Sequence, residues 1–116
     1  MSVLVVDDHP GFRASARRLL ELEGFEVVGE AADGASALEL VRQVNPELVL
    51  LDVALPDASG FEIAERLAGG RSRVILVSSR EQRDLGPRLR RCSALGFVAK
   101  ERLSGAALHA LLEAAP

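Results

Sequence analysis

Polar side chains follow four of the apolar runs in this chain, each at the point where the run ends. The runs and their polar ends are residues 3–6 before Asp7 and Asp8, 48–51 before Asp52, 74–77 before Ser78, and 97–99 before Lys100. If the runs are neighbouring parallel strands, their carboxyl ends meet at one edge of a sheet. Three carboxylates, a hydroxyl and an amine would then lie together. These groups suit a divalent cation held beside a carboxylate that accepts phosphate.

A cation would resolve the electrostatic conflict among the three carboxylates. Packed together, the carboxylates repel one another and raise each other's pKa. Oxygen ligands favour magnesium, which keeps several waters, so two or three protein oxygens are enough. With one Mg²⁺ and Lys100, the site is about neutral. An acyl phosphate on Asp52 would bring more negative charge, and the cation, Lys100 and Ser78 are the groups placed to receive it.

Each of these residues has an ordinary structural interpretation when it is taken alone. Asp8 could be only the N-cap of a helix, and Asp52 could satisfy backbone donors in a loop. Ser78 and Lys100 could be solvated surface residues. His9 is expected to lie exposed at a helix start rather than to bind a metal. The prediction therefore depends on the combination, because chance rarely places all of these types at the ends of successive strands.

The composition is that of one ordinary globular domain, residues 1–116. Hydrophobic residues make up 48% and charged residues 27% of the chain, which is long enough for one core. The net charge of -3 argues against direct contact with nucleic acid. No apolar run approaches the ~20 residues that span a membrane. The single cysteine, Cys92, and a start without a signal-peptide pattern predict a cytoplasmic location.

Helical periodicity fills the segments between the apolar runs. The predicted helices extend from Pro10 to Glu23, from Asp33 to Asn45, from Gly60 to Gly69, and onward from Ser104. The fourth connection contains Gly86-Pro87, which a regular helix cannot hold. We expect a loop through about Leu85 and a short helix from Pro87 to near Cys92.

The alternation of apolar runs and helices predicts an α/β fold. A fifth run lies around Val27 and Val28, so a strand and a helix alternate five times. Strands joined by single helices pair in parallel with right-handed crossovers, and continuously apolar strands indicate helices on both faces. The predicted class is a flavodoxin-like (βα)5 three-layer sandwich with a short or irregular helix 4. The sheet order 2-1-3-4-5 is taken from known folds of this type rather than worked out from the residues.

The motifs at the strand ends resemble those of one family. The segments that carry the resemblance are Val5-Val6-Asp7-Asp8-His9-Pro10, Leu51-Asp52-Val53-Ala54-Leu55-Pro56 followed by Gly60, Ser78-Ser79, and Gly96-Phe97-Val98-Ala99-Lys100. They are similar to the response-regulator receiver domains of bacterial two-component signalling, in the form common with a NarL/LuxR-type DNA-binding output. The resemblance covers nearly the whole chain.

The resemblance implies a role for each matching position. Asp52 would take a phosphoryl group from a sensor histidine kinase. Asp8, Asp52 and the backbone carbonyl of Ala54 would bind magnesium, with Asp7 helping through water. Lys100 would hold a phosphoryl oxygen.

The resemblance also implies a switch. Ser78 would move toward the phosphate, with Ser79 as the small residue that follows, and Phe97 would turn inward behind it. It leaves room for a homodimer and for a C-terminal DNA-binding output domain not present in this chain, and implies no membrane contact.

Some positions depart from the family pattern. Glu101 replaces the proline that often follows the lysine, and a cis bond at Lys100-Glu101 would cost ~2.5–4 kcal/mol. Leu55 replaces a common methionine. The Gly86-Pro87 break alters the face built from helix 4, strand 5 and helix 5, which often carries the output signal.

Two other functions compete with a phosphorylation switch. The first is a degenerate receiver that binds a partner without phosphorylation, against which the complete residue set argues. The second is a small magnesium-dependent phosphohydrolase, which would carry its nucleophile in an Asp-x-Asp motif rather than the adjacent pair Asp7-Asp8. A P-loop nucleotide binder is excluded because the chain lacks a Gly-x-x-x-x-Gly-Lys segment.

Overall fold

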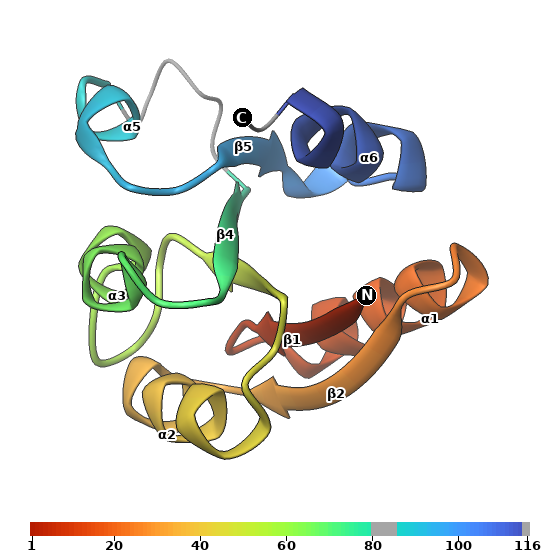
Figure 1. The fold of residues 1–116 in the computed structure, drawn as a ribbon, viewed down its shortest axis with the longest axis horizontal. Helices are drawn as coiled ribbons and strands as arrows, with labels where there is room; N and C mark the ends of the chain where they lie inside the picture. Colours follow the sequence, from red (N-terminus) through yellow and green to blue (C-terminus); the bar gives the residue numbers. More distant parts are fainter. Residues whose placement is uncertain (80–85, 115–116) are drawn as a thin grey trace.

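The computed structural model describes residues 1–79 and 86–114, and its centre is a five-stranded parallel sheet (Figure 1). In spatial order the strands are β2 (Glu26–Ala31), β1 (Ser2–Val6), β3 (Leu48–Asp52), β4 (Arg73–Ser78) and β5 (Gly96–Ala99). Each neighbouring pair is parallel. The predicted order 2-1-3-4-5 is therefore confirmed. It places β1 beside β3, so the two strands that end in carboxylates are neighbours.

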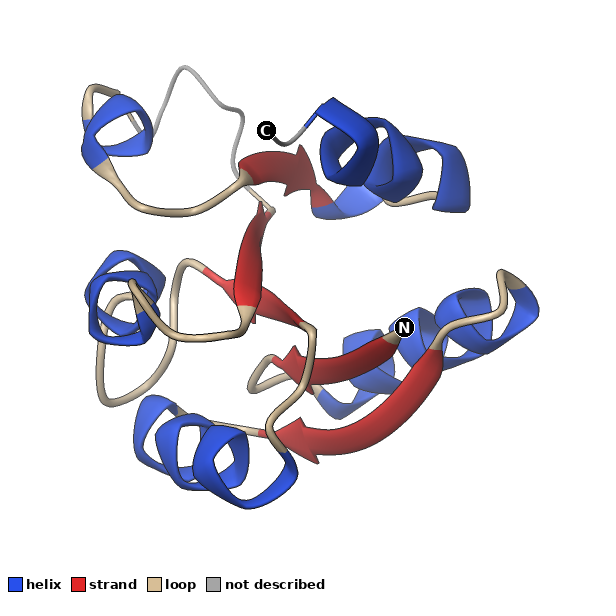
Figure 2. Ribbon diagram, viewed as in Figure 1, coloured by secondary structure: helices blue, strands red, loops and turns tan. Residues whose placement is uncertain are grey.

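Helices cover both faces of the sheet, as Figure 2 shows. The helices α1 (Pro10–Leu22) and α6 (Gly105–Ala114) pack on one face. The other face is covered by α2 (Gly34–Val44), α3 (Gly60–Leu67) and the short α5 (Arg88–Arg91). The predicted three-layer sandwich is confirmed. Within the described ranges, no helix is both long and apolar enough to cross a bilayer.

Alternate strand residues face the two helix layers. Val3, Val5, Leu48, Leu50, Ile75, Val77 and Val98 form the core under α1 and α6, whereas Leu4, Val6, Val49, Leu51, Val74 and Leu76 form the core on the other side. Asp7 and Asp52 come two residues after Val5 and Leu50, which face α1 and α6. Ser78 comes two residues after Leu76, which faces the other helix layer. The two-residue period therefore assigns both carboxylates to the α1 and α6 side of the sheet edge and Ser78 to the opposite side.

Capping side chains begin three of the helices. The Asp33 side chain accepts a hydrogen bond from the backbone N–H of Ser36, and Ser104 accepts one from Ala107. Ser59 caps α3 through the N–H of Phe61. Asn45, in the left-handed conformation, ends α2 as predicted.

The predicted short fourth helix is present as α5, after a turn in which Gly86 has a φ of +64°. The loop expected before it falls on residues 80–85, which lie outside the described residues. Contacts to α3 hold this region in place: Arg88 donates to the hydroxyl of Ser59 at 3.1 Å and lies 4.4 Å from the centre of the Phe61 ring. After β5, a 3-10 turn, η1 (Lys100–Arg102), leads to α6, and the Lys100–Glu101 peptide is trans.

Candidate functional site

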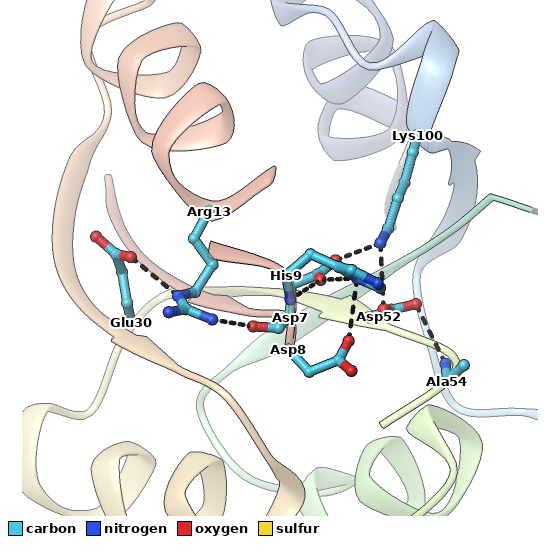
Figure 3. Close-up of polar contacts among 8 residues, drawn as sticks. All are labelled: Asp7, Asp8, His9, Arg13, Glu30, Asp52, Ala54 and Lys100. Atoms are coloured by element: carbon cyan, nitrogen blue, oxygen red, sulfur yellow. Dashed lines mark hydrogen bonds and ion pairs between the residues drawn. The ribbon is translucent and has the colours of Figure 1, made fainter. Parts of the chain in front are cut away.

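The carboxyl edge of the sheet brings together polar residues that are far apart in the sequence (Figure 3). Ligand atoms of Asp7, Asp8, His9 and Asp52 all lie within 4.8 Å of one another. The side chain of Lys100 extends toward this group from the far side. The expected convergence of three carboxylates and an amine is therefore present in the fold, whereas the roles of these residues stay predictions.

Asp7 is completely buried directly after β1. Its backbone N–H continues the strand ladder by donating to Ala31 at 3.0 Å. Its Oδ1 accepts from the backbone N–H of His9 at 2.8 Å and lies 3.0 Å from Nδ1 of the same residue. Its Oδ2 lies 2.6 Å from Nζ of Lys100 in an ion pair, but accepts no well-aligned hydrogen bond from any described residue. A buried carboxylate oxygen in this position has capacity for a further cationic ligand.

Asp8 lies exposed beside Asp7 and does not cap the following helix. The N-cap of α1 is His9, and its side chain makes no capping hydrogen bond. Instead, Nδ1 of His9 lies 3.1 Å from Oδ1 of Asp8, so the ring contacts both carboxylates. The ordinary interpretation of Asp8 as an N-cap does not apply. His9 is exposed as predicted, but its contact with the acidic pair was missed, although its place directly after that pair was a signal.

Asp52 is only 3% exposed at the end of β3. The backbone at Gly60 lies close to the backbone of Asp52 and Val53. Its Oδ1 accepts from the backbone N–H of Ala54 at 3.2 Å, and its Oδ2 accepts from Nζ of Lys100 at 3.2 Å. The N–H of Gly60 donates to the carbonyl of Val53 at 2.7 Å. A Cβ at position 60 would collide with the backbone oxygen of Asp52. The start of α3 therefore fixes the strand end that carries Asp52.

Lys100 links the two buried carboxylates. Its Nζ contacts Oδ2 of both Asp7 and Asp52, and its side chain is 16% exposed. The ammonium also lies 4.6 Å from the centre of the Phe12 ring in α1. Lys100 is the only lysine in the chain. A single cation therefore serves two carboxylates.

The pKa values of the three groups are shifted in different directions. Burial raises the pKa of Asp52, and the negative charge of Asp7 acts in the same direction, whereas the backbone N–H of Ala54 and the Lys100 ammonium oppose the rise without cancelling it. Burial also acts to raise the pKa of Asp7, but the adjacent Lys100 ammonium and the contacts with His9 outweigh it, and the pKa of Asp7 is lowered. Burial disfavours the charge of Lys100, but Asp7 and Asp52 together raise its pKa. Asp52 is thus the carboxylate with the least compensation, and an additional cation would favour its ionised form.

The remaining predicted residues lie beside this cluster. Ser78, 4% exposed, ends β4 and pairs with Ala99 in the strand register, one residue before Lys100. Ser79 is exposed. Phe97 in β5 is partly buried and packs against the core on the α2 and α3 side. Ser78 and Phe97 therefore belong to the opposite side of the sheet edge from Asp7 and Asp52.

Arg13 and Glu30 support the acidic pair in a way that the sequence analysis missed. Nη1 of Arg13 donates to the backbone oxygen of Asp7 at 2.6 Å, and its Nε donates to Oε1 of Glu30 at 3.2 Å (Figure 3). Arg17 donates to the other oxygen of Glu30 at 2.5 Å. The nearness of Glu30 to the end of the second apolar run was a signal, but its partner on α1 depends on the fold. These contacts anchor the backbone of the acidic pair to α1.

The donor set fits a hard divalent cation. Asp7, Asp8 and Asp52 supply carboxylate oxygens, and the oxygen of Asp7 without a well-aligned hydrogen bond is a place where a cation would replace a missing partner. Ala54 lies beside these carboxylates, since its backbone N–H donates to Oδ1 of Asp52 at 3.2 Å. The residues present therefore fit a magnesium ion.

Comparison with known proteins gives a consistent result. The family described as response regulator receiver domain matches residues 3–113. The chain is 37% identical over 115 residues to the virulence-factor transcription regulator BvgA of Bordetella pertussis, and 35% identical over 117 residues to the response regulator GacA of Pseudomonas aeruginosa. These alignments cover 97% and 98% of this chain but 53% of each relative. The chain thus spans about half the length of the relatives that it matches.

Solved structures agree with the family match. The signal receiver domain of NarL from Mycobacterium tuberculosis superposes with a TM-score of 0.84 at 35% identity, over 96% of this chain and 95% of that domain. A LuxR-family two-component response regulator from Aurantimonas superposes with a TM-score of 0.83 at 33% identity, over 97% of this chain and 82% of that one.

Proposed function

Because the chain belongs to the response regulator receiver domain family, we propose that it is a phosphorylation switch in which Asp52 accepts a phosphoryl group from a sensor histidine kinase. The observation that carries the proposal is the position of Asp52. Its carboxylate is buried at the carboxyl edge of the sheet, beside Asp7 and Asp8, and Lys100 contacts it at 3.2 Å. The proposed domain comprises residues 1–116 and turns over no substrate of its own.

Asp8, Asp52 and the backbone carbonyl of Ala54 would hold a magnesium ion, with Asp7 contributing through water. When bound, the ion would neutralise negative charge on the carboxylates and on the phosphoryl oxygens. The raised pKa of Asp52 supports the need for such an ion, because it shows that the ionised carboxylate is disfavoured without additional positive charge. A carboxylate nucleophile must be ionised, and the present cation, Lys100, is shared between two carboxylates.

The transfer forms one bond and breaks another. A carboxylate oxygen of Asp52 attacks the phosphorus of a phosphohistidine, an O–P bond forms, and the N–P bond breaks. The electron pair of the broken bond stays on the imidazole nitrogen, which takes a proton from solvent. Lys100 stabilises the transferred oxygens electrostatically, because its Nζ already lies beside Asp52.

The response to phosphorylation would pass through Ser78, Phe97 and Lys100. Ser78 would hydrogen-bond the phosphoryl group, with Ser79 beside it, and Phe97 would turn inward behind it. A hydrogen bond to a charged group contributes ~1.5–3 kcal/mol, whereas shifting a population from 1:99 to 99:1 needs ~5.5 kcal/mol. Ser78 alone is therefore insufficient, and Lys100 must supply part of the preference for the active state.

The proposal extends to partners and location. Since the chain covers 53% of BvgA and GacA, we propose a C-terminal output domain outside this chain that binds DNA, and a homodimer on activation. A cytoplasmic location fits the single free cysteine, Cys92.

Intact-mass measurement tests the proposed function. The protein is incubated with magnesium and a small phosphodonor such as acetyl phosphate, and we expect the mass of one phosphoryl group to be added. Asp52→Asn should gain nothing, while the matched exposed-site variant Asp57→Asn should still be phosphorylated. An unmodified wild-type mass would instead favour a phosphorylation-independent interaction module. Continued turnover of an added phosphoester would favour a hydrolase.

A further inference from the structure

His9 has no role in the proposed switch, yet its ring lies against the carboxylates of the metal site. Nδ1 is 3.0 Å from Oδ1 of Asp7 and 3.1 Å from Oδ1 of Asp8 (Figure 3). The side chain makes no capping hydrogen bond to α1. It is 69% exposed, so its position is not imposed by burial in the core. Among the described residues, the ring of His9 makes its polar contacts with these two carboxylates.

The two distances match the spacing of ligands around one metal ion. Neighbouring ligands of an octahedral ion with bonds of about 2.1 Å are separated by about 3.0 Å, which is that bond length multiplied by the square root of two. Nδ1 of His9 lies at this spacing from an oxygen of each carboxylate. A cation bound to Oδ1 of Asp8, with Asp7 contributing through water, would therefore have the imidazole nitrogen of His9 within reach.

The chemistry of the ring allows this ligation. A neutral imidazole carries its hydrogen on one nitrogen and a lone pair on the other. With the hydrogen on Nε2, Nδ1 is free to bind a metal. The exposure of the ring leaves Nε2 accessible to water as its hydrogen-bond partner.

We propose that His9 is a further ligand of this site and that it sets the metal preference. Magnesium prefers oxygen ligands, whereas imidazole suits first-row transition metals. Adding one nitrogen to the oxygen ligands from Asp8 and Asp52 should therefore raise the affinity for Co²⁺ or Ni²⁺ and leave the affinity for Mg²⁺ almost unchanged. This inference rests on the metal site of the proposed function, and extends it from magnesium to a second class of ion.

Calorimetric titration of the protein with MgCl₂ and with CoCl₂ tests the inference. We expect His9→Ala to weaken Co²⁺ binding by about tenfold or more and to change Mg²⁺ binding by less than about threefold. The two effects differ because Co²⁺ favours an imidazole ligand and Mg²⁺ does not. The matched control is His109→Gln, which changes the other histidine of the chain, on α6 against the ring of Phe25. This control should bind both ions like the wild type.

A spectroscopic measurement identifies the ligand directly. Cobalt bound to Nδ1 should produce a strongly shifted, exchangeable N–H resonance from Nε2 in the proton spectrum. This resonance should be present in His109→Gln and absent in His9→Ala, whose fold is checked by far-ultraviolet circular dichroism.

Each other outcome overturns the inference in a distinct way. An equal loss of Co²⁺ and Mg²⁺ affinity in His9→Ala would mean that the ring only positions the carboxylates. An unchanged Co²⁺ affinity, or an unshifted His9 ring, would mean that it is not a ligand. Either result can coexist with magnesium-dependent phosphorylation of Asp52. Absence of binding by both ions would instead remove the metal site of the proposed function and this inference together.

Discussion

Replacing Lys100 by methionine tests the electrostatic account of the site most directly. The substitution keeps much of the side-chain volume but removes the ammonium that contacts Oδ2 of both Asp7 and Asp52, at 2.6 Å and 3.2 Å. Removing one partner of a buried ion pair typically costs 3–5 kcal/mol. Asp52 can limit this cost by taking up a proton. At pH 7, protonating a carboxyl with an unfolded pKa of about 3.9 costs about 4 kcal/mol.

The expected cost of Lys100→Met in metal-free buffer at pH 7 is therefore about 3–4 kcal/mol of unfolding free energy. The same reasoning gives a pH dependence. Burial already raises the pKa of Asp52, and losing Lys100 raises it further, so the variant binds a proton more readily than the unfolded chain. The protonation cost falls to about 1.5 kcal/mol at pH 5. The difference between wild type and variant should thus shrink as the pH falls from 7 to 5.

Urea unfolding followed by far-ultraviolet circular dichroism is the appropriate assay, because the chain contains no Trp or Tyr. The matched control is Arg102→Met, which removes an exposed cation two residues away and should change stability by less than about 0.5 kcal/mol. In the Asp52→Asn background, the cost of Lys100→Met should fall clearly, because one unpaired carboxylate is gone. Magnesium should restore part of the lost stability, since the ion no longer competes with an ammonium for these oxygens.

Two results would refute this reasoning. The first is a cost of Lys100→Met that is the same at pH 5 and pH 7. The second is a cost that is unchanged in the Asp52→Asn background. Either would show that Lys100 does not stabilise the fold through Asp52, and would leave its ion pair with Asp7 or its packing against the Phe12 ring as the source.

Three further predictions concern neighbouring residues. Without magnesium, Asp52→Asn should raise the melting temperature, because it removes a carboxylate whose ionised form is disfavoured by burial; a lowered value in EDTA would contradict the crowded-carboxylate account. Gly60→Ala should destabilise the protein and slow phosphorylation of Asp52, because its Cβ would collide with backbone, whereas Gly11→Ala, with open space at its Cβ, should be neutral or slightly stabilising in urea unfolding. The backbone N–H groups of Gly34 and Ala35 lower the pKa of Asp57 below its unfolded value, so Asp57 stabilises the fold above that unfolded pKa, and this stabilisation is lost as the pH falls through the folded pKa. Asp57→Asn should accordingly be less stable than wild type at pH 7 and equally stable in strong acid, and a difference that persists in acid would point to packing instead.

The elements of the fold were predictable because their signals are local. The strands are short apolar runs with a period of two, and capping residues such as Asp33 and Ser104 act within three positions of themselves. Gly86-Pro87 excluded a long fourth helix for the same kind of reason, since both residues restrict their own backbone. The strand order was available only through the family resemblance.

The sequence by itself determined which reactive groups stand at the strand ends. A carboxylate placed directly after a buried parallel strand must lie at the carboxyl edge of the sheet, so Asp7 and Asp52 were identifiable from the chain alone. Only the tertiary structure decided which groups touch. The sharing of Lys100 between two carboxylates joins residues 48 and more positions apart. Side-chain geometry also decides the hydrogen bond from Arg13 to the backbone oxygen of Asp7 and the position of the His9 ring. Such contacts depend on how the packed elements set distances and rotamers, and no local pattern encodes them.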